Sequence, residues 1–269
     1  MELRDHPEGG YQFLATSPNA PYSAGVVAMP GYEIVHAVPR RHVPVPDGFA
    51  LIEQHLQSLG RPRTALCAVE LRGAAPYTPA EWSAPDGFNE RYRSVLREWG
   101  LFIDGYPVVA RTNVVPVVQP PDAQVLHAFS YTVPLGATAH TAGTSGQARQ
   151  AGASEDAALP PTFVSFVSSG APEAQAMWES GAGVDQRLLS SLDAIGSAII
   201  ALGRSWEDAT TVNVYLREGI STSLAEAALQ RIGGAARHGL HWYLTKTPLL
   251  GPFLECDARG VRREIQIES

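Results

Sequence analysis

One arginine stands alone inside an otherwise apolar stretch of the chain. Arg111 lies within Ala110–Val115, whose residues are typical of a β-strand. A buried arginine is costly unless a carboxylate partner or an anionic ligand meets it. The stretch therefore indicates one of two things: an anion-binding site, or an arginine that lies at an exposed sheet edge or in a structural ion pair.

Other catalytic signatures are weak or missing in the sequence. Of the eight histidines only His238 and His241 lie close together, and without a third ligand they are weak support for zinc; two partly exposed polar residues are the alternative. Cys67 falls within an apolar run and is expected to be a small core residue rather than a nucleophile. The sequence holds no phosphate-binding glycine loop and no serine nucleophile elbow. We therefore expect neither a metal nor a cofactor.

The composition is that of a globular protein. The chain has 269 residues, of which 45% are hydrophobic and 17% charged, and its mean hydropathy is -0.07. A formal net charge of -7 argues against binding nucleic acid through its phosphates. No apolar run approaches the ~18–20 residues that cross a bilayer, and residues 1–10 contain no apolar signal core. Cys67 and Cys256 are too few and too far apart for a secreted disulfide scaffold. We expect a cytoplasmic enzyme or binding protein with no nucleic-acid or membrane partner.

A low-complexity stretch divides the chain. Residues 136–161 are nearly all small, polar, glycine or proline, so they cannot build a core and are predicted to be a flexible linker or surface loop. The predicted organisation is a first domain of residues 1–135, this linker, and a second domain of residues 162–269.

The segments on either side of the linker repeat one pattern. Two helices predicted from apolar spacing end in Leu-Gly-Arg, and a strand that ends in Leu-Arg follows each. The arginines of the first motif, Arg61 and Arg204, are 143 residues apart, and those of the second, Arg72 and Arg217, are 145 apart. Each half is therefore predicted to be an α+β unit, a mainly antiparallel sheet with two helices on one face. The matching segments are the helices 49–59 and 188–202, the strands 65–72 and 211–217, and the helices 88–99 and 223–237.

Three short segments resemble motifs of the Rid/YjgF superfamily of enamine and imine deaminases. They are residues 20–23 (APYS), 88–92 (FNERY) and 111–113 (RTN). The whole duplicated chain is similar to the two-domain, 2-aminomuconate deaminase-like members of that superfamily. The resemblance implies a duplicated chorismate-mutase-like fold that closes into a trimer with clefts between neighbouring domains.

The resemblance also implies roles for individual residues. Arg111 would bind a substrate carboxylate, and the backbone of Asn113 would contact the substrate nitrogen. Tyr22 and Asn89 would line the cleft and bind substrate.

The two copies of the pattern are incomplete in complementary ways. In the first copy the position of the family's water-positioning glutamate, counted from Pro121, falls on His127. In the second copy Glu255 is in place within residues 253–258, whereas the expected arginine position falls near His241. His127 is a candidate proton carrier because an imidazole near its usual pKa moves protons at neutral pH. A cleft-lining residue without a proton role is the alternative.

The function implied by the resemblance is hydrolytic deamination of a small carboxylated enamine or imine, similar to 2-aminomuconate, with release of ammonia. Arg111, His127 and Glu255 are the expected catalytic residues. Two alternatives stay open: a non-deaminase tailoring enzyme of secondary metabolism, or a ligand-binding protein without catalysis. The expected partners are a small carboxylated metabolite and further copies of the chain.

Overall fold

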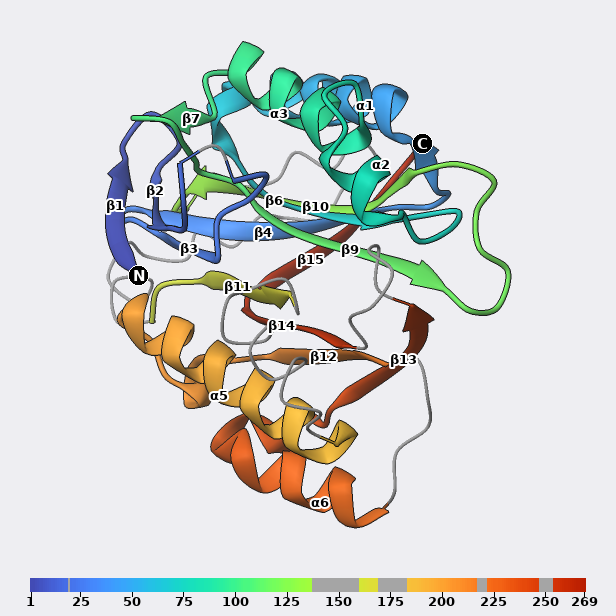
Figure 1. The fold of residues 1–269 in the computed structure, drawn as a ribbon. Helices are drawn as coiled ribbons and strands as arrows, with labels where there is room; N and C mark the ends of the chain where they lie inside the picture. The colour runs from blue at the N-terminus through green and yellow to red at the C-terminus, as the bar shows by residue number, and fades with distance from the viewer. Residues whose placement is uncertain (19, 137–159, 169–182, 217–221, 247–253) are drawn as a thin grey trace.

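The structure is a computed structural model, which describes residues 1–18, 20–136, 160–168, 183–216, 222–246 and 254–269 (Figure 1). Residues 1–136 form, in chain order, β1 (Glu2–His6), β2 (Tyr11–Ala15), β3 (Gly25–Ala28), β4 (Tyr32–Pro39), β5 (Val43–Pro44), α1 (Val45–Ser58), η1 (Arg63–Ala65), β6 (Leu66–Arg72), α2 (Pro79–Ser83), α3 (Phe88–Glu98), β7 (Phe102–Ile103), β8 (Tyr106–Pro107), β9 (Ala110–Pro116) and β10 (Val125–Pro134). The described residues after 159 form β11 (Phe163–Ser168), α5 (Val184–Ala201), η3 (Trp206–Asp208), β12 (Thr211–Leu216), α6 (Thr222–Arg231), η4 (Gly233–His238), β13 (His241–Lys246), β14 (Leu254–Gly260) and β15 (Arg263–Ile267).

Helices α1 and α5 form where apolar residues recur every three or four positions. Ile52 and Leu56 of α1 and Ile195 of α5 are buried on the inner helix faces. Gly60 and Gly203 follow the two helix ends with φ of +64° and +71°, a left-handed conformation that glycine adopts without strain. The predicted helices and their Leu-Gly-Arg ends are confirmed.

Thirteen of the described strands form one mixed sheet in which strands of the two halves interleave, and β7 and β8 pair separately with each other. The order is β1-β2-β3-β11-β14-β12-β13-β9-β6-β10-β4-β15, and β5 pairs with β10. β11 lies between β3 and β14 and is antiparallel to both, whereas β15 is parallel to β4. The predicted duplicated chorismate-mutase-like (Rid/YjgF) fold, with a mainly antiparallel sheet in each half, is therefore wrong.

The physical reason lies in the strand edges. A sheet confined to the first half would leave backbone groups of β3 and β4 without partners, and buried backbone groups need hydrogen bonds. β11 and β15 from the second half supply those partners. Apolar spacing predicts which residues form a strand but not which strand lies next to it, so this pairing could not be predicted.

Two groups of strands face each other in the middle of the molecule, and helices cover the outer sides. Figure 1 shows α1, α2 and α3 above β6, β9 and β10, and α5 and α6 below β11, β12 and β14. β9 contacts both β11 and β14 across the interior. A cavity of about 10 Å³ lies there, lined by residues of β6, β9, β10, β11 and β14. Its polar and charged lining residues include Glu70, Arg111, Thr112, Asp257 and Arg259.

Most of the predicted linker, residues 137–159, lies outside the described residues. The division into residues 1–135, 136–161 and 162–269 therefore stays a prediction. In the described part of the chain, no helix has both the length and the hydropathy needed to cross a bilayer.

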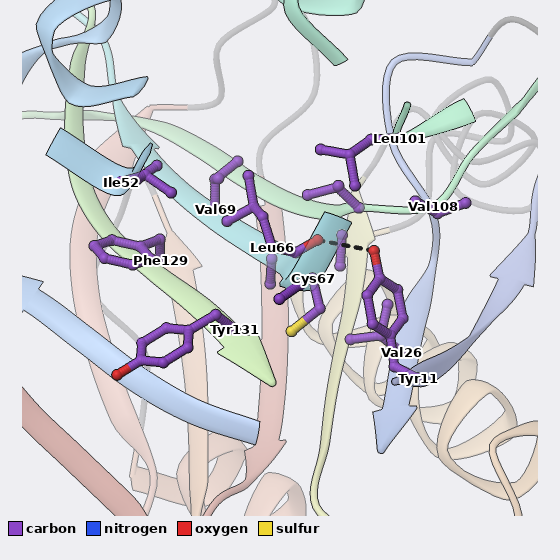
Figure 2. Packing of buried hydrophobic residues seen from close by; sticks show 14 of the residues in the cluster. Tyr11, Val26, Ile52, Leu66, Cys67, Val69, Leu101, Val108, Phe129 and Tyr131 are labelled. Atoms are coloured by element: carbon purple, nitrogen blue, oxygen red, sulfur yellow. Dashed lines mark hydrogen bonds between the residues drawn. The ribbon is translucent and has the colours of Figure 1, made fainter. Parts of the chain in front are cut away.

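The core of the first half includes a buried tyrosine with a satisfied hydroxyl. Tyr11 of β2 donates its hydroxyl hydrogen to the carbonyl oxygen of Leu66 in β6, at 2.8 Å. Figure 2 shows this bond among the packed side chains of Val26, Cys67 and Val108. The bond joins the β1–β3 segment to the main strands of the sheet.

Replacing Tyr11 by phenylalanine removes this bond and keeps the ring. We expect Tyr11→Phe to lower the free energy of unfolding by about 1–2 kcal/mol, because a buried hydrogen bond is lost and the Leu66 carbonyl loses a partner. Urea unfolding of the parent and of Tyr11→Phe measures this difference in the free energy of unfolding. Tyr243→Phe, at a half-exposed ring, is the control and should change stability by less than about 0.5 kcal/mol. Equal effects of the two substitutions would contradict this account.

Candidate active site

Arg111 is buried in the middle of the molecule. It lies in β9 opposite Val69 of the parallel strand β6, and its side chain is only 2% exposed. The charged group is therefore held away from water by the fold itself. The alternative of an exposed edge arginine does not describe this residue.

Four aromatic rings surround the guanidinium group of Arg111. Its central carbon lies 5.1 Å from the ring centroid of Tyr22, 5.8 Å from Trp82, 5.7 Å from Phe88 and 4.7 Å from Tyr92. Aromatic faces attract a cation, but they do not replace the hydrogen bonds it makes with water. Burial lowers the pKa of Arg111 from its ordinary value, yet an arginine stays charged at neutral pH.

A loop before β3 and helix α3 place these rings near β9. Tyr22 precedes Ser23, whose backbone N–H donates to the carbonyl oxygen of Val109 at 2.9 Å. Phe88 and Tyr92 lie one helical turn apart on the buried face of α3. The aromatic surroundings of Arg111 therefore come from a loop and a helix that pack against the same strand.

The guanidinium group has one protein acceptor among the described residues. Arg111 Nη2 donates to Asn89 Oδ1 at 3.0 Å, and Asn89 Nδ2 donates to the carbonyl oxygen of Trp82 at 3.2 Å. In the described part of the chain, Nε and Nη1 of Arg111 have no hydrogen-bond partner. A buried arginine with free donors is suited to bind a carboxylate through two parallel hydrogen bonds.

Glu255 of β14 brings an acid from the second half to this arginine. It is 2% exposed, and the backbone N–H of Asn113 donates to its carboxyl group. Burial raises the pKa of Glu255 to about 8, although the charge of Arg111 and the Asn113 N–H act in the opposite direction. Glu255 therefore holds a proton at neutral pH and can act as an acid.

The structure brings together five of the six predicted site residues. Tyr22 and Asn89 contact the Arg111 guanidinium, and Asn113 contacts Glu255. The Asn113 side chain also accepts a hydrogen bond from Gln124, at 2.6 Å. The site is thus composite: the arginine comes from the first half and the acid from the second.

His127 lies in a different cluster. Its Nδ1 is 2.9 Å from Nε2 of His42, and no contact with Arg111 is found among the described residues. Burial and the positive charge of Arg72 lower the pKa of His127 to about 4, so its imidazole is neutral at pH 7. A proton role for His127 stays a prediction.

A buried ionic network lies between the two groups of strands. Arg259 of β14 lies 3.4 Å from Glu70 of β6 and 3.0 Å from Glu264 of β15. Asp257 of β14 accepts hydrogen bonds from Asn213 and Thr112, at 2.9 and 3.4 Å. This network joins the halves close to Glu255.

Sequence reasoning missed some of these residues. Phe88 and Tyr92 belong to the motif 88–92, which supported the family resemblance but was given no role for these two rings. Their spacing of four residues, which places both side chains on one face of a helix, was the available signal. No local signal marked Trp82 or Asp257, because their importance depends on contacts with distant strands.

The described residues contain no group of three metal-ligating side chains, and His241 Nδ1 lies 3.1 Å from Asn213 Oδ1. Cys67 is buried in the core, where burial raises the pKa of its thiol.

Three comparisons with known proteins cover most of the chain. Residues 3–265 match the model of a family described as 2-aminomuconate deaminase CnbZ. A 2-amino-5-chloromuconate deaminase from Comamonas testosteroni is 32% identical over 258 residues, which make up 95% of each protein. A chorismatase crystal structure has a TM-score of 0.42 and 13% identity, over 88% of this chain and 77% of that one.

Because Arg111 Nε and Nη1 have no hydrogen-bond partner among the described residues, we expect Arg111 to contribute little to the free energy of unfolding. In Arg111→Met the Asn89 contact is lost, but so is the cost of a buried charge, and Glu255 is already protonated at neutral pH. We expect the free energy of unfolding at pH 7 to stay within about 1 kcal/mol of the parent value or to rise.

Arg259→Met is the matched control, because Arg259 is also buried but pairs with Glu70 and Glu264. It should lose about 3 kcal/mol, since the buried carboxylates of Glu70 and Asp257 lose the cation that lies between them. Urea unfolding compares the two variants. A loss in Arg111→Met as large as in Arg259→Met would make Arg111 a structural residue.

Proposed function

The chain belongs to the 2-aminomuconate deaminase CnbZ family, and from this premise we propose that it is an enzyme that hydrolyses the C–N bond of a 2-aminomuconate-type enamine and releases ammonia. The observation that carries the proposal is that Glu255, which is protonated at neutral pH, lies near Arg111, whose Nε and Nη1 have no hydrogen-bond partner in the part of the chain that the structure describes. One group would bind a carboxylate and the other would supply a proton.

Arg111 would hold the carboxylate next to the amino-bearing carbon. Two parallel hydrogen bonds from the guanidinium fork fix the carboxylate plane, and Asn89 fixes the fork through Nη2. Tyr22 and Tyr92 offer flat apolar surfaces to the conjugated carbon chain. The site would therefore select a planar unsaturated acid.

Glu255 would move the protons of the reaction. Its acid form protonates the enamine at carbon, which creates a C=N bond with a positively charged nitrogen and leaves the Glu255 carboxylate. The carboxylate then takes a proton from water as the water oxygen bonds to the carbon. Glu255 next gives this proton to the nitrogen, and the C–N bond breaks to release ammonia. The new carbonyl group loses its hydroxyl proton to Glu255, which restores the starting acid.

Two further roles follow the resemblance to the Rid/YjgF superfamily. The backbone carbonyl of Asn113 would stabilise the positively charged nitrogen, since Asn113 lies two residues after Arg111 and next to Glu255. His127 would handle a proton only if substrate binding brought it to the reacting atoms. Superfamily membership, a trimeric assembly and a cytoplasmic location are further predictions; light scattering tests the assembly, and a mass of 28.8 kDa at micromolar concentration would contradict it.

Ammonia release from freshly generated 2-aminomuconate tests the proposal. Catalytic release, coupled to formation of the 2-oxo acid, supports a deaminase. Tight binding without turnover would instead support a ligand-binding protein. Conversion of another carboxylated metabolite without ammonia would support a tailoring enzyme.

Arg111→Lys keeps the positive charge but loses the planar fork. We expect kcat/KM to fall about 30- to 1000-fold, which corresponds to roughly 2–4 kcal/mol of lost transition-state binding. Steady-state kinetics measure the change, and circular dichroism checks that the fold is kept. Unchanged turnover in Arg111→Lys would show that Arg111 does not bind the substrate.

Glu255→Gln removes the transferable proton and keeps the shape of the side chain. We expect kcat to fall by about 10²- to 10⁴-fold. In the parent enzyme kcat/KM should decline as pH rises through about 8, because the acid form that starts the reaction is lost. His127→Ala serves as the comparison: a larger loss of kcat there than in Glu255→Gln would assign the proton role to His127.

A further inference from the structure

We propose that Asp257 is a positioning residue for this reaction: its buried carboxylate, fixed next to Glu255 by hydrogen bonds from two other strands, keeps the proton on Glu255. The inference rests on the proposed function, because it concerns the acid form that starts the reaction. In the described part of the chain no hydrogen bond or ion pair joins Asp257 to Arg111, and Asp257 has no proposed contact with the substrate.

The strand geometry places the two carboxyl groups side by side. Glu255 and Asp257 are two residues apart in β14, so their side chains lie on the same face of the sheet. Both point toward β9: the backbone N–H of Asn113 donates to Glu255, and Oγ1 of Thr112 donates to Asp257. The interior cavity is lined by Arg111 and Thr112 of β9 and by Asp257 of β14, so Asp257 lies at the face of β14 that meets β9.

Hydrogen bonds hold Asp257 in place as an acceptor. Asn213 Nδ2 of β12 donates to Oδ1 at 2.9 Å, and Thr112 Oγ1 donates to Oδ2 at 3.4 Å. Donors to both oxygens favour the ionised form, because a carboxylate accepts hydrogen bonds that a protonated acid accepts less well.

Charges from several strands surround the pair. Burial and the negative charge of Glu70 raise the pKa of Asp257 to about 6, whereas Arg259 acts in the opposite direction. Asp257 is therefore ionised at neutral pH. The titratable and charged groups that face the pair are Arg111 of β9, Glu70 and Arg72 of β6, Tyr215 of β12, Tyr243 of β13, and Arg259 of β14.

A second negative charge beside Asp257 is unfavourable in a buried site. Once Asp257 is ionised, ionisation of Glu255 would place two carboxylates on one strand face with little water to screen them. The charge of Asp257 therefore raises the pKa of Glu255 in the same direction as burial, against the opposite effects of Arg111, the Asn113 N–H and Arg72. The pair would titrate in two steps, Asp257 before Glu255.

The pH profile of kcat/KM for ammonia release tests this role. In Asp257→Asn, which keeps the side-chain shape without the charge, the basic limb should move down by about one pH unit. Asp257→Glu keeps the charge and should hold the limb near its parent position. Glu264→Gln is the matched control, because Glu264 also pairs with Arg259 but is 50% exposed; it should leave the limb unchanged.

A basic limb that stays in place in Asp257→Asn, or that moves equally in Glu264→Gln, would overturn the inference. Asp257→Ser is the second variant should the asparagine variant not fold, and the same downward shift is expected.

A second measurement separates this inference from the proposed function. The free energy of unfolding is compared between the parent and Glu255→Gln across pH, and again in the Asp257→Asn background. Because the pKa of Glu255 is raised by folding, its favourable contribution to stability is present below its unfolded pKa of ~4.3 and is lost as pH rises toward 8. In the Asp257→Asn background this loss should end at a lower pH. The same end point in both backgrounds overturns the inference even if no ammonia is released.

Discussion

The balance between burial and charge at Arg111 and Glu255 governs the rest of the site. Both side chains are removed from water, so each charged form carries a desolvation cost. The arginine stays charged, whereas the glutamate responds by holding its proton. Among the described residues the result is a cation with free donors beside a neutral acid, and not the ion pair that the residue types alone would indicate. This arrangement can bind an anion and give up a proton.

The interleaved sheet makes this arrangement possible. Arg111 and Glu255 are 144 residues apart, and they meet because β9 and β14 face each other across the interior. The ionic contact between Glu70 and Arg259 joins the same two groups of strands, and β11 and β15 complete strand edges in the first half. The strand pairing that makes the predicted two-sheet fold wrong is also what brings the two residues into one site.

The sequence predicts helices from local apolar spacing, but it does not predict which strands pair with each other. Apolar spacing predicted α1 and α5 because helix periodicity is a local property. The family resemblance marked Arg111 and Glu255 but assigned them to separate, incomplete copies. Strand order depends on edge pairing between distant segments, so neither their meeting nor the separation of His127 from Arg111 could be derived. Trp82 had no signal for the same reason.

Substrate binding and acid strength are coupled in this geometry. The charge of Arg111 lowers the pKa of Glu255, against the larger effect of burial. A carboxylate bound to Arg111 would cancel that charge and so remove the main influence that favours ionised Glu255. Binding the correct anion would therefore hold the proton on Glu255 at the moment the reaction needs it. A ligand without a carboxylate would leave the charge of Arg111 in place. The selection of substrate and the protonation state of Glu255 therefore depend on the same guanidinium group.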